Sequence, residues 1–424
     1  MRHSPIRRVL FFCRTFYLDD SNGAAVAHRA LAAALARWGF VIEALCGTTF
    51  DTVARGDPAE HLAARGIPLE YAGGDTWDVG PGGITAADPA HLRTAIDGVA
   101  LTVQRRPTRR LAPPDPFEAA ELLALFESTC GRFRPDVLVT YGGDPLTQEV
   151  LARGRRAGIA TIFALHNFLY TDRSPFAHAD AVVVPSQFAA DEYARSIGLR
   201  CTPLPYVVDP ARVRAEDQEP YFLTFVNPCP DKGLFPFVRI ADELGRRRPD
   251  IPILVVESRG TEADLLACGL DLRRHRTIHL MPRTPDPRDF WRVTRVCLMP
   301  SVFRETSGLV AIEAMLNGIP VVASDRGALT ETLGRAGLLL PLPAHLTPAS
   351  RHLPTADEVA PWVDAILRLW DDASFADEHR RRALAESRRW APEVLKPRYA
   401  RFLAGLRAGS GPQTAVHDEA GAGP

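Results

Sequence analysis

Apolar strands alternate with helical segments along this chain, and that alternation limits the possible folds more than any other feature. The first strands are apolar throughout instead of alternating with polar residues, which is typical of a parallel sheet covered by helices on both faces. Each strand–helix–strand unit is followed by another of the same kind. The expected strands of this first series are RVLFF (8–12), FVIEALC (40–46), PDVLVTY (135–141), ATIFALH (160–166) and ADAVVVPS (179–186), with helices over about 24–37 and 145–157.

A second series of the same kind begins after an extended stretch rich in proline and charge, residues 205–220. Because 424 residues exceed the size of one ordinary domain, the simplest interpretation is an α/β chain with two doubly wound, Rossmann-like parallel sheets. We expect an N-terminal domain over 1–205 and a C-terminal domain over 206–390. The strands of the second series are expected at 221–227, 251–257, 275–281, 295–301 and 320–324.

Three segments lie outside this pattern. Residues of about 72–116 are rich in turn-forming residues, so we expect an irregular excursion from the first domain. A C-terminal helix over 391–407 is expected to pack back on the N-terminal domain. The Gly-, Ala- and Pro-rich end, 408–424, is expected to be a disordered tail.

The charge balance and the cysteines exclude several classes of protein. The chain has 51 acidic and 50 basic residues, so it has no overall field that would hold a nucleic acid or an anionic membrane. Its seven cysteines are never closer than 28 residues, which argues against a zinc site or a disulfide framework and favours reduced thiols in a cytoplasmic protein. No apolar stretch approaches the ~18 residues that a membrane-spanning helix needs, so we expect a soluble or at most peripheral protein.

The window from 296 to 334 carries the most chemical information. A strand ends at Pro300, a loop carries Glu305, and Thr306–Gly308 open a helix that presents Glu313 about two turns in. The free backbone N–H groups at such a helix start suit a phosphate. Two carboxylates beside a phosphate would repel it, so Glu305 and Glu313 are better placed to accept hydrogen bonds from hydroxyl groups. A nucleotide sugar supplies both the diphosphate and the hydroxyls.

This Glu-x7-Glu spacing, within TSGLVAIEAMLNGIPVVAS (306–324) and followed by Gly327, resembles the retaining glycosyltransferases of family 4, in glycosyltransferase group 1. The resemblance implies the GT-B fold, in which two Rossmann-like domains face a cleft. It also implies that the C-terminal domain binds a nucleotide-diphospho-sugar and the N-terminal domain an acceptor hydroxyl, with retention at the anomeric carbon. Glu305 is then a catalytic residue. The donor-binding residues are Ser307, Gly308, Leu309 and Glu313.

The resemblance extends into both domains. FVNPCPDKG (225–233) is similar to the loop where the family places a basic pair near the diphosphate, and Lys232 matches its lysine. The arginine that many members carry after this strand is absent, since Asn227 and Pro228 stand there. In the first domain, Gly23 matches a glycine that approaches the donor phosphates, and His166 in LHNF matches a catalytic histidine near the donor sugar.

The use of lysine supports this assignment. The chain has two lysines, Lys232 and Lys396, among 50 cations. Arginine has replaced lysine almost everywhere else, and Lys232 lies where a diphosphate needs a cation, whereas Lys396 has no explanation. No Asp-x-Asp motif is present, so we expect catalysis without metal or cofactor, the charge being met by Lys232 and a helix N-terminus. Arg259 and Arg304 are further candidates.

Two assignments stay open at this stage. Asp144, in YGGDP, is either an acceptor contact or a turn-forming helix cap. Arg105, Arg106, Arg109 and Arg110 form a dense basic patch, which is a solvated loop, a contact with an anionic lipid surface at the inner membrane face, or a site for a polyanionic acceptor.

The alternatives to a glycosyltransferase belong to different classes. One is a GT-B-fold sugar-nucleotide epimerase or phosphorylase, although a pyridoxal phosphate phosphorylase needs a buried lysine that this chain barely offers. Another is a non-catalytic nucleotide-sugar-binding protein. A dinucleotide-dependent dehydrogenase is excluded because NGAAVA (22–27) is not the G-x-G-x-x-G that should follow the first strand. The acceptor, whether saccharide, lipid or small molecule, cannot be read from the sequence.

Overall fold

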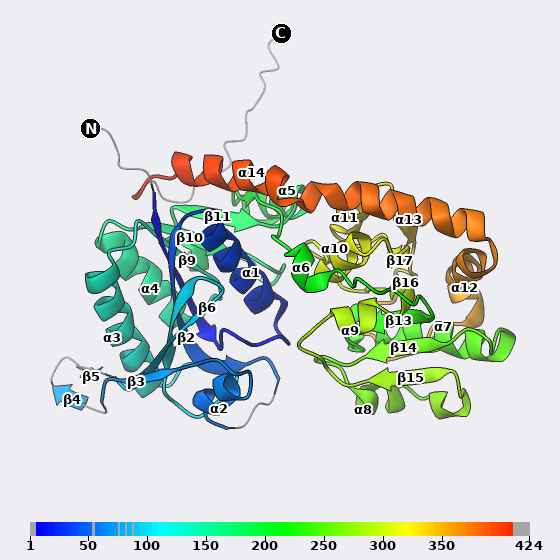
Figure 1. Cartoon of the computed structure of the whole chain (residues 1–424), viewed down its shortest axis with the longest axis horizontal. Coiled ribbons are helices and arrows are strands. Elements are labelled where there is room, and N and C mark those ends of the chain that lie inside the picture. Colours follow the sequence, from blue (N-terminus) through cyan, green and yellow to red (C-terminus); the bar gives the residue numbers. More distant parts are fainter. Residues whose placement is uncertain (1–5, 53–55, 75–76, 81–82, 87–88, 410–424) are drawn as a thin grey trace, which may run out of the picture. The chain divides into compact units, whose positions relative to one another are not determined.

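The computed structural model describes residues 6–52, 56–74, 77–80, 83–86 and 89–409 (Figure 1). The chain divides into two compact units. Unit 1 consists of two segments, the N-terminal part of the chain up to Leu204 and the part from Lys396 onward. Unit 2 runs from Pro205 to Leu395. Each unit has its own sheet and its own apolar core.

The sheet of unit 1 has the order β12-β11-β10-β9-β1-β2-β7-β6-β3, and β8 pairs with β2 beside β7. Its strands are parallel except β6, which is antiparallel to both β3 and β7. The central strand β1 is buried from its second residue to its last, as its unbroken apolar sequence predicts. The bounds are β1 (Arg8–Thr15), β2 (Val41–Phe50), β3 (Glu70–Ala72), β6 (His91–Ile96), β7 (Val99–Gln104), β8 (Arg109–Arg110), β9 (Val137–Thr140), β10 (Ala160–Ala164), β11 (Ala181–Val184) and β12 (Thr202–Pro203).

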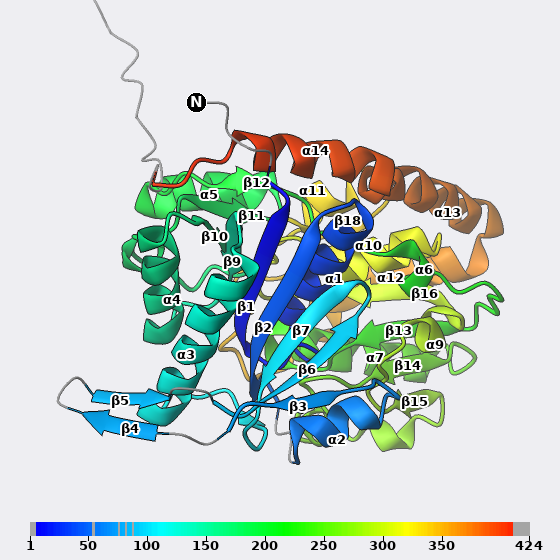
Figure 2. The same ribbon diagram turned by 60° about the vertical axis from the view of Figure 1, so that its left-hand side comes forward.

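Helices cover both faces of this sheet (Figure 2). On one face α1 (Gly23–Arg37) packs its alanines and Leu35 against strand residues such as Phe11 and Val139. On the other face lie α3 (Pro116–Phe133), α4 (Pro145–Arg156) and α5 (Gln187–Ile197). The remaining short helices of unit 1 are α2 (Pro58–Ala63) and η1 (Ser174–Phe176). This is the doubly wound arrangement predicted for the first domain.

The expectation that residues 72–116 are irregular was wrong. The segment includes β6, β7 and β8, which extend the main sheet beyond β2, and the separate hairpin of β4 (Trp77–Gly80) and β5 (Gly83–Ala86). Its turn-forming residues lie between short strands, and Gly98 makes the tight β6–β7 turn with a positive φ of 79°. The turn-rich composition therefore indicated hairpins rather than a loss of structure.

The C-terminal helix α14 (Pro392–Gly405) packs on the sheet of unit 1 once the chain has passed Lys396. The ring of Tyr399 lies 5.8 Å from that of Trp38, and Leu403 is buried in the core beside α1. Most of the expected disordered tail, from residue 410 onward, lies outside the described residues.

The sheet of unit 2 is parallel throughout, in the order β15-β14-β13-β16-β17-β18. Its central strands are again nearly continuous in apolar residues, and they lie at the positions expected from the sequence. Their bounds are β13 (Phe222–Val226), β14 (Ile253–Val256), β15 (Ile278–Met281), β16 (Thr294–Met299), β17 (Val321–Ser324) and β18 (Leu338–Leu340).

The core of unit 2 joins its sheet to α7 (Leu234–Arg247) and α12 (Ala356–Asp371), through side chains such as Phe237, Trp362 and Ile366. Phe225 of β13 stacks on Phe237 of α7 with ring centroids 4.3 Å apart. The other helices are α6 (Pro210–Val213), η2 (Pro230–Lys232), α8 (Glu262–Leu266), η3 (Leu272–Arg274), α9 (Arg288–Trp291), α10 (Leu309–Leu316), α11 (Leu329–Leu333), α13 (Ala373–Ser387) and η4 (Arg388–Trp390).

Each sheet has a switch point beside its first strand. In unit 2 the chain moves outward from β13 through β14 to β15 and then returns to the other side of β13 at β16. In unit 1 it moves from β1 to β2 and returns to the other side of β1 at β9. Ligands of doubly wound sheets bind outside the carboxyl ends of the strands at such a switch point. The loops after β13 and β16, and those after β1 and β9, are therefore the places to look for a site.

Candidate functional site

The loops after β13 and β16 pack tightly against each other at the switch point of unit 2. Gly233 has a φ of 87°, and a Cβ atom added there would lie 1.8 Å from the carbonyl oxygen of Pro300. The amide of Phe303 donates a hydrogen bond of 3.0 Å to the carbonyl of Asp231. Only glycine allows this close approach of the two backbones, because any side chain at position 233 would push the two loops apart.

Lys232 and Glu305 form an ion pair across these loops. The distance from Lys232 Nζ to Glu305 Oε1 is 2.5 Å, and the same oxygen accepts a 2.8 Å hydrogen bond from the hydroxyl of Ser301. Burial alone would lower the pKa of Lys232, but the charge and hydrogen bond of Glu305 outweigh it and raise that pKa. Two residues that lie 73 positions apart, both predicted to be catalytic, are thus in direct contact.

The backbone of Glu305 is also fixed. It forms a parallel bridge with Gly327, and the amide of Ala328 donates a 2.8 Å hydrogen bond to the Glu305 carbonyl. The loop that carries the carboxylate is therefore held from the side of β17 as well as from the side of β13. A carboxylate held this way reaches a ligand with little loss of conformational entropy.

The helix α10 begins directly after this loop, with its first turn open. Its N-cap is Gly308, which has a φ of 96° and makes no side-chain cap, and Leu309 is the first helical residue. The carbonyl of the preceding Ser307 is held by a 2.7 Å hydrogen bond from Thr332 Oγ1. An N-terminus without a side-chain acceptor leaves N–H groups for an anion, as predicted for Ser307, Gly308 and Leu309.

Glu313 lies about one turn into α10 and not two, because the helix begins at Leu309 and the three residues after Glu305 are not helical. Its Oε2 atom accepts a 3.0 Å hydrogen bond from the buried indole of Trp291. Burial raises the pKa of Glu313 to about 7, and the hydrogen bond from Trp291 opposes that rise. The two acids of the motif therefore differ. Glu305 is an ion-paired carboxylate, and Glu313 is a carboxyl group with a pKa of about 7.

At the switch point of unit 1, two of the sequence-predicted residues, Gly23 and Asp144, lie at helix starts. Gly23 is the first residue of α1, whose N-cap is Asn22, and a Cβ atom at Gly23 would have nothing within 4 Å. Asp144 caps α4 by accepting hydrogen bonds from the amide of Thr147 (3.1 Å) and from its hydroxyl (2.8 Å). The cap alternative for Asp144 is confirmed, and its contact with an acceptor stays a prediction.

His166 follows β10, next to this switch point, and lies in a row of rings that ends at the buried His28. The ring of Tyr141 is 5.6 Å from that of His166 and 4.9 Å from that of His28. Burial lowers the pKa of His166 to about 4, so this imidazole is neutral at pH 7. Burial, and next the neighbouring His166, lower the pKa of His28 as well. A neutral imidazole exchanges hydrogen bonds with hydroxyl groups without adding charge.

The basic patch of unit 1 is largely neutralised by α3 and the residue that precedes it. Arg106 pairs with Glu121 at 2.5 Å and with Asp115 at 3.5 Å, and Arg109 pairs with Asp115 and with the buried Glu118. Its neighbour Arg105 lies over the ring of Tyr71, with 4.9 Å between its Cζ atom and the ring centroid. The patch therefore offers less positive charge than its sequence indicates, and its contact with a membrane stays a prediction.

Sequence reasoning missed three side chains that complete the unit 2 site. Ser301 and Trp291 each donate a hydrogen bond to one acid of the motif, and Tyr206 is hydrogen-bonded to the side chain of Thr306. They come from three different segments of the chain. Of the three, Ser301 could have been found from the sequence, because it lies four residues before Glu305. Trp291 and Tyr206 meet the motif only through tertiary packing.

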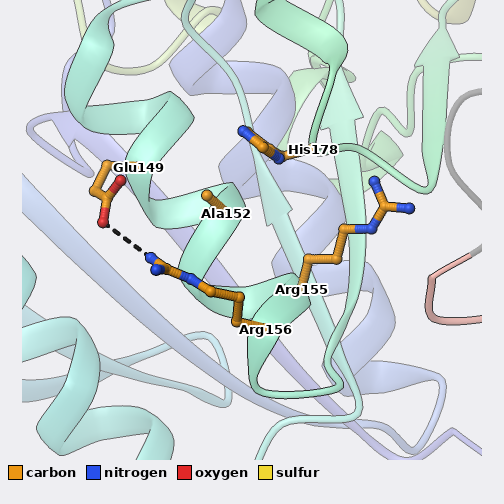
Figure 3. A pocket seen from close by; sticks show the side chains of 5 residues that line it. All are labelled: Glu149, Ala152, Arg155, Arg156 and His178. Carbon is orange, nitrogen blue, oxygen red and sulfur yellow. Dashed lines mark hydrogen bonds and ion pairs between the residues drawn. The ribbon is translucent and has the colours of Figure 1, made fainter.

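A surface pocket of about 490 Å³ lies elsewhere in unit 1 (Figure 3). It is lined by Glu149, Ala152, Arg155, Arg156 and His178, from α4 and the turn before β11. Its charges are engaged, because Arg156 pairs with Glu149 at 3.1 Å and Arg155 donates to the carbonyl of Ala177 at 3.2 Å. None of the sequence-predicted site residues lines it.

Metal sites and membrane spans were searched for in the described part of the chain. There, no three His, Cys, Asp or Glu side chains come together as ligands for a metal ion. Likewise, none of the helices in the described ranges is long and apolar enough to cross a bilayer. Independence of metal stays a prediction.

Residues 220–372 match the family model described as glycosyl transferases group 1. Over 170 residues the chain is 33% identical to the D-inositol 3-phosphate glycosyltransferase of Pseudarthrobacter chlorophenolicus. That match covers 38% of this chain and 37% of the relative, so the chain spans little more than a third of the curated protein's length. Lys232, Glu305 and Glu313 lie within the matched range.

The fold is shared over almost the whole chain. Sucrose-phosphate synthase from Thermosynechococcus elongatus has a TM-score of 0.62 and 17% identity, with 94% of this chain and 99% of that one covered. The pneumococcal O-GlcNAc transferase GtfA, in a complex with UDP and GlcNAc, has a TM-score of 0.65 and 12% identity, with 94% and 98% covered. The chain therefore has the GT-B fold expected from its sequence.

Proposed function

We propose that this chain is a retaining glycosyltransferase that moves a sugar from a nucleoside-diphospho-sugar to an acceptor hydroxyl, without a metal ion. The observation that carries the proposal is the Lys232–Glu305 ion pair at the switch point of unit 2. On either side of the pair, α7 and α10 begin at Gly233 and Gly308, neither of which makes a side-chain cap. Cation, carboxylate and open helix ends together match the charge pattern of a sugar diphosphate.

The first requirement of the reaction is to stabilise the leaving diphosphate. Breaking the bond between the anomeric carbon and the diphosphate develops negative charge on the phosphate oxygens. Lys232 and the N-terminal N–H groups of α10 are fixed before the reaction, so they stabilise this charge without reorganising. This is the role that a divalent metal performs in other transferases.

The second requirement is to hold the sugar and the ribose. Glu305 keeps one oxygen on Lys232 and Ser301, and its other oxygen can accept hydrogen bonds from sugar hydroxyls. We assign Glu313, whose Oε2 atom accepts a hydrogen bond from Trp291, to a ribose hydroxyl of the donor. From unit 1, the neutral His166 is assigned to the donor sugar and Gly23 to the approach of the donor phosphates.

The acceptor is a hydroxyl of a saccharide, a lipid or a small molecule, bound by unit 1. In line with its cysteines, we place the enzyme in the cytoplasm, with contact to the inner membrane face through the Arg105–Arg110 segment as one option. The similarity to an inositol phosphate glycosyltransferase supports a polyol acceptor as the first class to try.

The test is a screen of the full chain against UDP-, GDP-, ADP- and TDP-sugars. We expect one base to raise the melting temperature, and the same donor to release nucleoside diphosphate when a polyol acceptor is added. Binding without release in the presence of many acceptors would favour the non-catalytic alternative. Release of an isomerised nucleotide sugar without an acceptor would favour the epimerase. Absence of any thermal shift would contradict the proposal.

A further inference from the structure

The regular ladder between β16 and β17 ends where the candidate site begins. The two strands pair in parallel register as far as Met299 and Ala323. Pro300 follows Met299 and has no N–H group, so it cannot donate to the ladder. The loop that carries Glu305 therefore leaves the regular ladder at Pro300, and other contacts fix its course.

Side chains of the segment that follows β17 continue the pairing. The hydroxyl of Ser324 donates a 2.8 Å hydrogen bond to the carbonyl of Ser301. The Nη1 atom of Arg326 donates one of 3.0 Å to the carbonyl of Val302. The backbone bridge at Glu305 comes next, in the same order along both segments. The parallel register of the two strands thus extends past their ends as far as the carboxylate of the ion pair.

Arg326 differs from the rest of this segment because it also holds a second loop. Its guanidinium donates to the carbonyls of Pro343 at 2.8 Å, Leu342 at 3.4 Å and Leu346. The side chains of Leu342 and Leu346 belong to the same buried core as that of Val302. The loop after β18 is therefore anchored in the core of unit 2, and Arg326 connects the loop after β16 to it.

The chemistry of arginine suits this connection. Arg326 is half-buried, and burial lowers its pKa, an effect that the charge of the neighbouring Asp325 opposes. The guanidinium is planar, with five N–H donors in a rigid fork, whereas lysine offers three donors on a flexible stem. A fork bonded to four backbone carbonyls fixes the two loops relative to each other.

The hold on Val302 bears on both members of the ion pair. Its neighbour Ser301 donates a hydroxyl hydrogen bond of 2.8 Å to Oε1 of Glu305. Its other neighbour, Phe303, donates its amide to the carbonyl of the residue before Lys232. A shift of Val302 would therefore disturb contacts of the acid and of the base together. Misplacement of a reacting group by about 1 Å can lower a rate about 100-fold.

We propose that Arg326 is a positioning residue, which holds Glu305 against Lys232 by fixing the carbonyl of Val302 to the loop after β18. The inference rests on the proposed function, because it concerns the carboxylate that this function assigns to the reaction. In this assignment Arg326 acts through Glu305 and makes no contact with the donor. The alternative interpretation of the same contacts is that Arg326 anchors only the loop after β18.

The test combines hydrogen–deuterium exchange with steady-state kinetics on the full chain, using the donor that raises the melting temperature of the unmodified protein. Arg326→Met keeps the length of the side chain and removes its donors, and Arg326→Lys keeps the charge with fewer donors. Arg295→Met is the matched control, because Arg295 lies near the other end of β16 and donates a 2.8 Å hydrogen bond to the carbonyl of Trp370. We expect Arg326→Met and the control to lower the melting temperature by similar amounts, about 2–5 °C.

The two interpretations differ in where exchange rises and in whether the rate falls. If Arg326 is a positioning residue, amide exchange in Arg326→Met rises about tenfold in the peptides of Phe303 and Ala328. The amide of each donates a hydrogen bond that holds the loop of Glu305. We expect kcat to fall about tenfold and the donor KM to change less than about threefold, because Lys232 and the start of α10 still bind the diphosphate. Arg326→Lys should recover part of both losses, and the control should show neither.

Each outcome decides the inference. Faster exchange around Glu305 together with a lower kcat in Arg326→Met, both partly restored in Arg326→Lys, supports it. Faster exchange confined to residues 341–347 with an unchanged kcat overturns it. A lower kcat without faster exchange around Glu305, or an equal loss of kcat in the control, overturns it as well.

Two further results are provided for. If Arg326→Met does not fold, Arg326→Lys decides the inference by the same two measurements. If the unmodified protein transfers no sugar from any donor, the proposed function is overturned and the assignment of Arg326 to the reaction with it. In that case the exchange data still decide whether Arg326 holds the loop of Glu305.

Discussion

The helices at the two switch points begin in different ways. In unit 1, α1 and α4 start after Asn22 and Asp144, whose side chains accept hydrogen bonds from the amides of the first turn. In unit 2, α7 and α10 start at Gly233 and Gly308, and neither glycine makes a side-chain cap. Unit 1 thus satisfies its helix ends with its own side chains. In α7 the amide of Leu234 donates to the carbonyl of Cys229 and Pro236 has no N–H, so α10 is the helix of unit 2 whose start suits another acceptor.

The polar groups at the two switch points also differ. Unit 2 carries paired full charges at its switch point, Lys232 with Glu305 and Arg259 with Asp231. Beside the switch point of unit 1 lie neutral rings, with His28 and His166 both deprotonated at pH 7. Unit 1 also holds charge near this point, because the buried Arg14 pairs with Glu118 at 3.1 Å and lies 3.9 Å from Asp144. The neutral rings, and not an absence of charge, therefore distinguish it from unit 2.

The largest expected effect is on catalysis in unit 2. Replacing Lys232 by Ala removes the fixed cation beside the open helix ends, and we expect the rate of sugar transfer to fall about 100- to 1000-fold. Glu313→Ala is expected to abolish transfer as well. Release of nucleoside diphosphate measures the rate, and circular dichroism checks that the variants are folded. Full transfer by either variant would show that the charged region is not the catalytic one.

The next effect concerns the pH dependence of stability. Glu313 has its pKa raised to about 7 in the folded chain, so between its unfolded value and pH 7 the folded state keeps a proton that the unfolded state has lost. The free energy of unfolding therefore falls as the pH rises through this window and stays lower above it. Glu313→Gln removes this loss.

We expect Glu313→Gln to be more stable than the unmodified protein by up to about 3 kcal/mol at pH 8, and equally stable at pH 4. Urea unfolding at both pH values measures the difference. The amide keeps an oxygen for the indole N–H of Trp291, so the packing is conserved. A stability difference that is the same at both pH values would mean that the pKa of Glu313 is not raised in the folded chain.

A pair of glycine substitutions separates the two kinds of helix start. Gly308→Ala forces a φ of 96° on alanine and places its Cβ atom 2.8 Å from Leu329, so we expect a loss of about 1–3 kcal/mol in unfolding free energy. Gly23→Ala has nothing within 4 Å of the new Cβ atom, so we expect no loss, or a gain of up to about 1 kcal/mol.

The activity of Gly23→Ala sharpens the comparison further. If donor phosphates approach Gly23, the added methyl group should raise KM for the donor while the melting temperature is unchanged. An unaltered KM would remove Gly23 from the donor site and leave phosphate binding to unit 2 alone.

A smaller effect is expected from the cap of α4. Asp144→Ala removes the acceptor of the Thr147 amide, which costs about 1 kcal/mol of stability. Asp144→Asn retains an acceptor and serves as the control, with a loss of a few tenths of a kcal/mol or less. If Asp144→Asn keeps its stability but loses transfer activity, Asp144 contacts the acceptor in addition to capping the helix.

The last prediction is that removing metal ions has no effect on the transfer rate. If fixed cations and open helix ends stabilise the leaving group, EDTA should leave the transfer rate unchanged, and added magnesium should not raise it. Loss of activity in EDTA that returns with magnesium would show that unit 2 does not stabilise the charge by itself.

The sequence predicted the strands of both sheets well because parallel strands buried on two faces are apolar throughout. Through the resemblance of their motifs it also assigned Lys232 and Glu305 to one site, but it did not predict that the two side chains form an ion pair. It did not predict where α10 begins, because that depends on the left-handed backbone of Gly308. Glu313 was therefore placed one helical turn too far along.

The remaining errors come from contacts between distant segments. Arg106 and Arg109 look like an unopposed basic patch until α3 folds back and presents Glu118 and Glu121 to them. The hairpin of β6 and β7 lies among glycines and prolines that mask its short strands. Trp291, the partner of Glu313, precedes it by 22 residues and meets it only in the folded unit.

The scarcity of lysine has a practical consequence for labelling chemistry. Reagents that acylate amines find one lysine side chain in each unit: Lys396, which is exposed, and Lys232, which is 28% exposed and held by Glu305. Both acylated peptides can be quantified by mass spectrometry in one digest. The extent of Lys396 acylation would be the internal standard, and the extent of Lys232 acylation would fall as a ligand covers that lysine. The ratio of Lys232 to Lys396 acylation, measured at increasing concentrations of each candidate donor, would order the donors by affinity without knowledge of the acceptor.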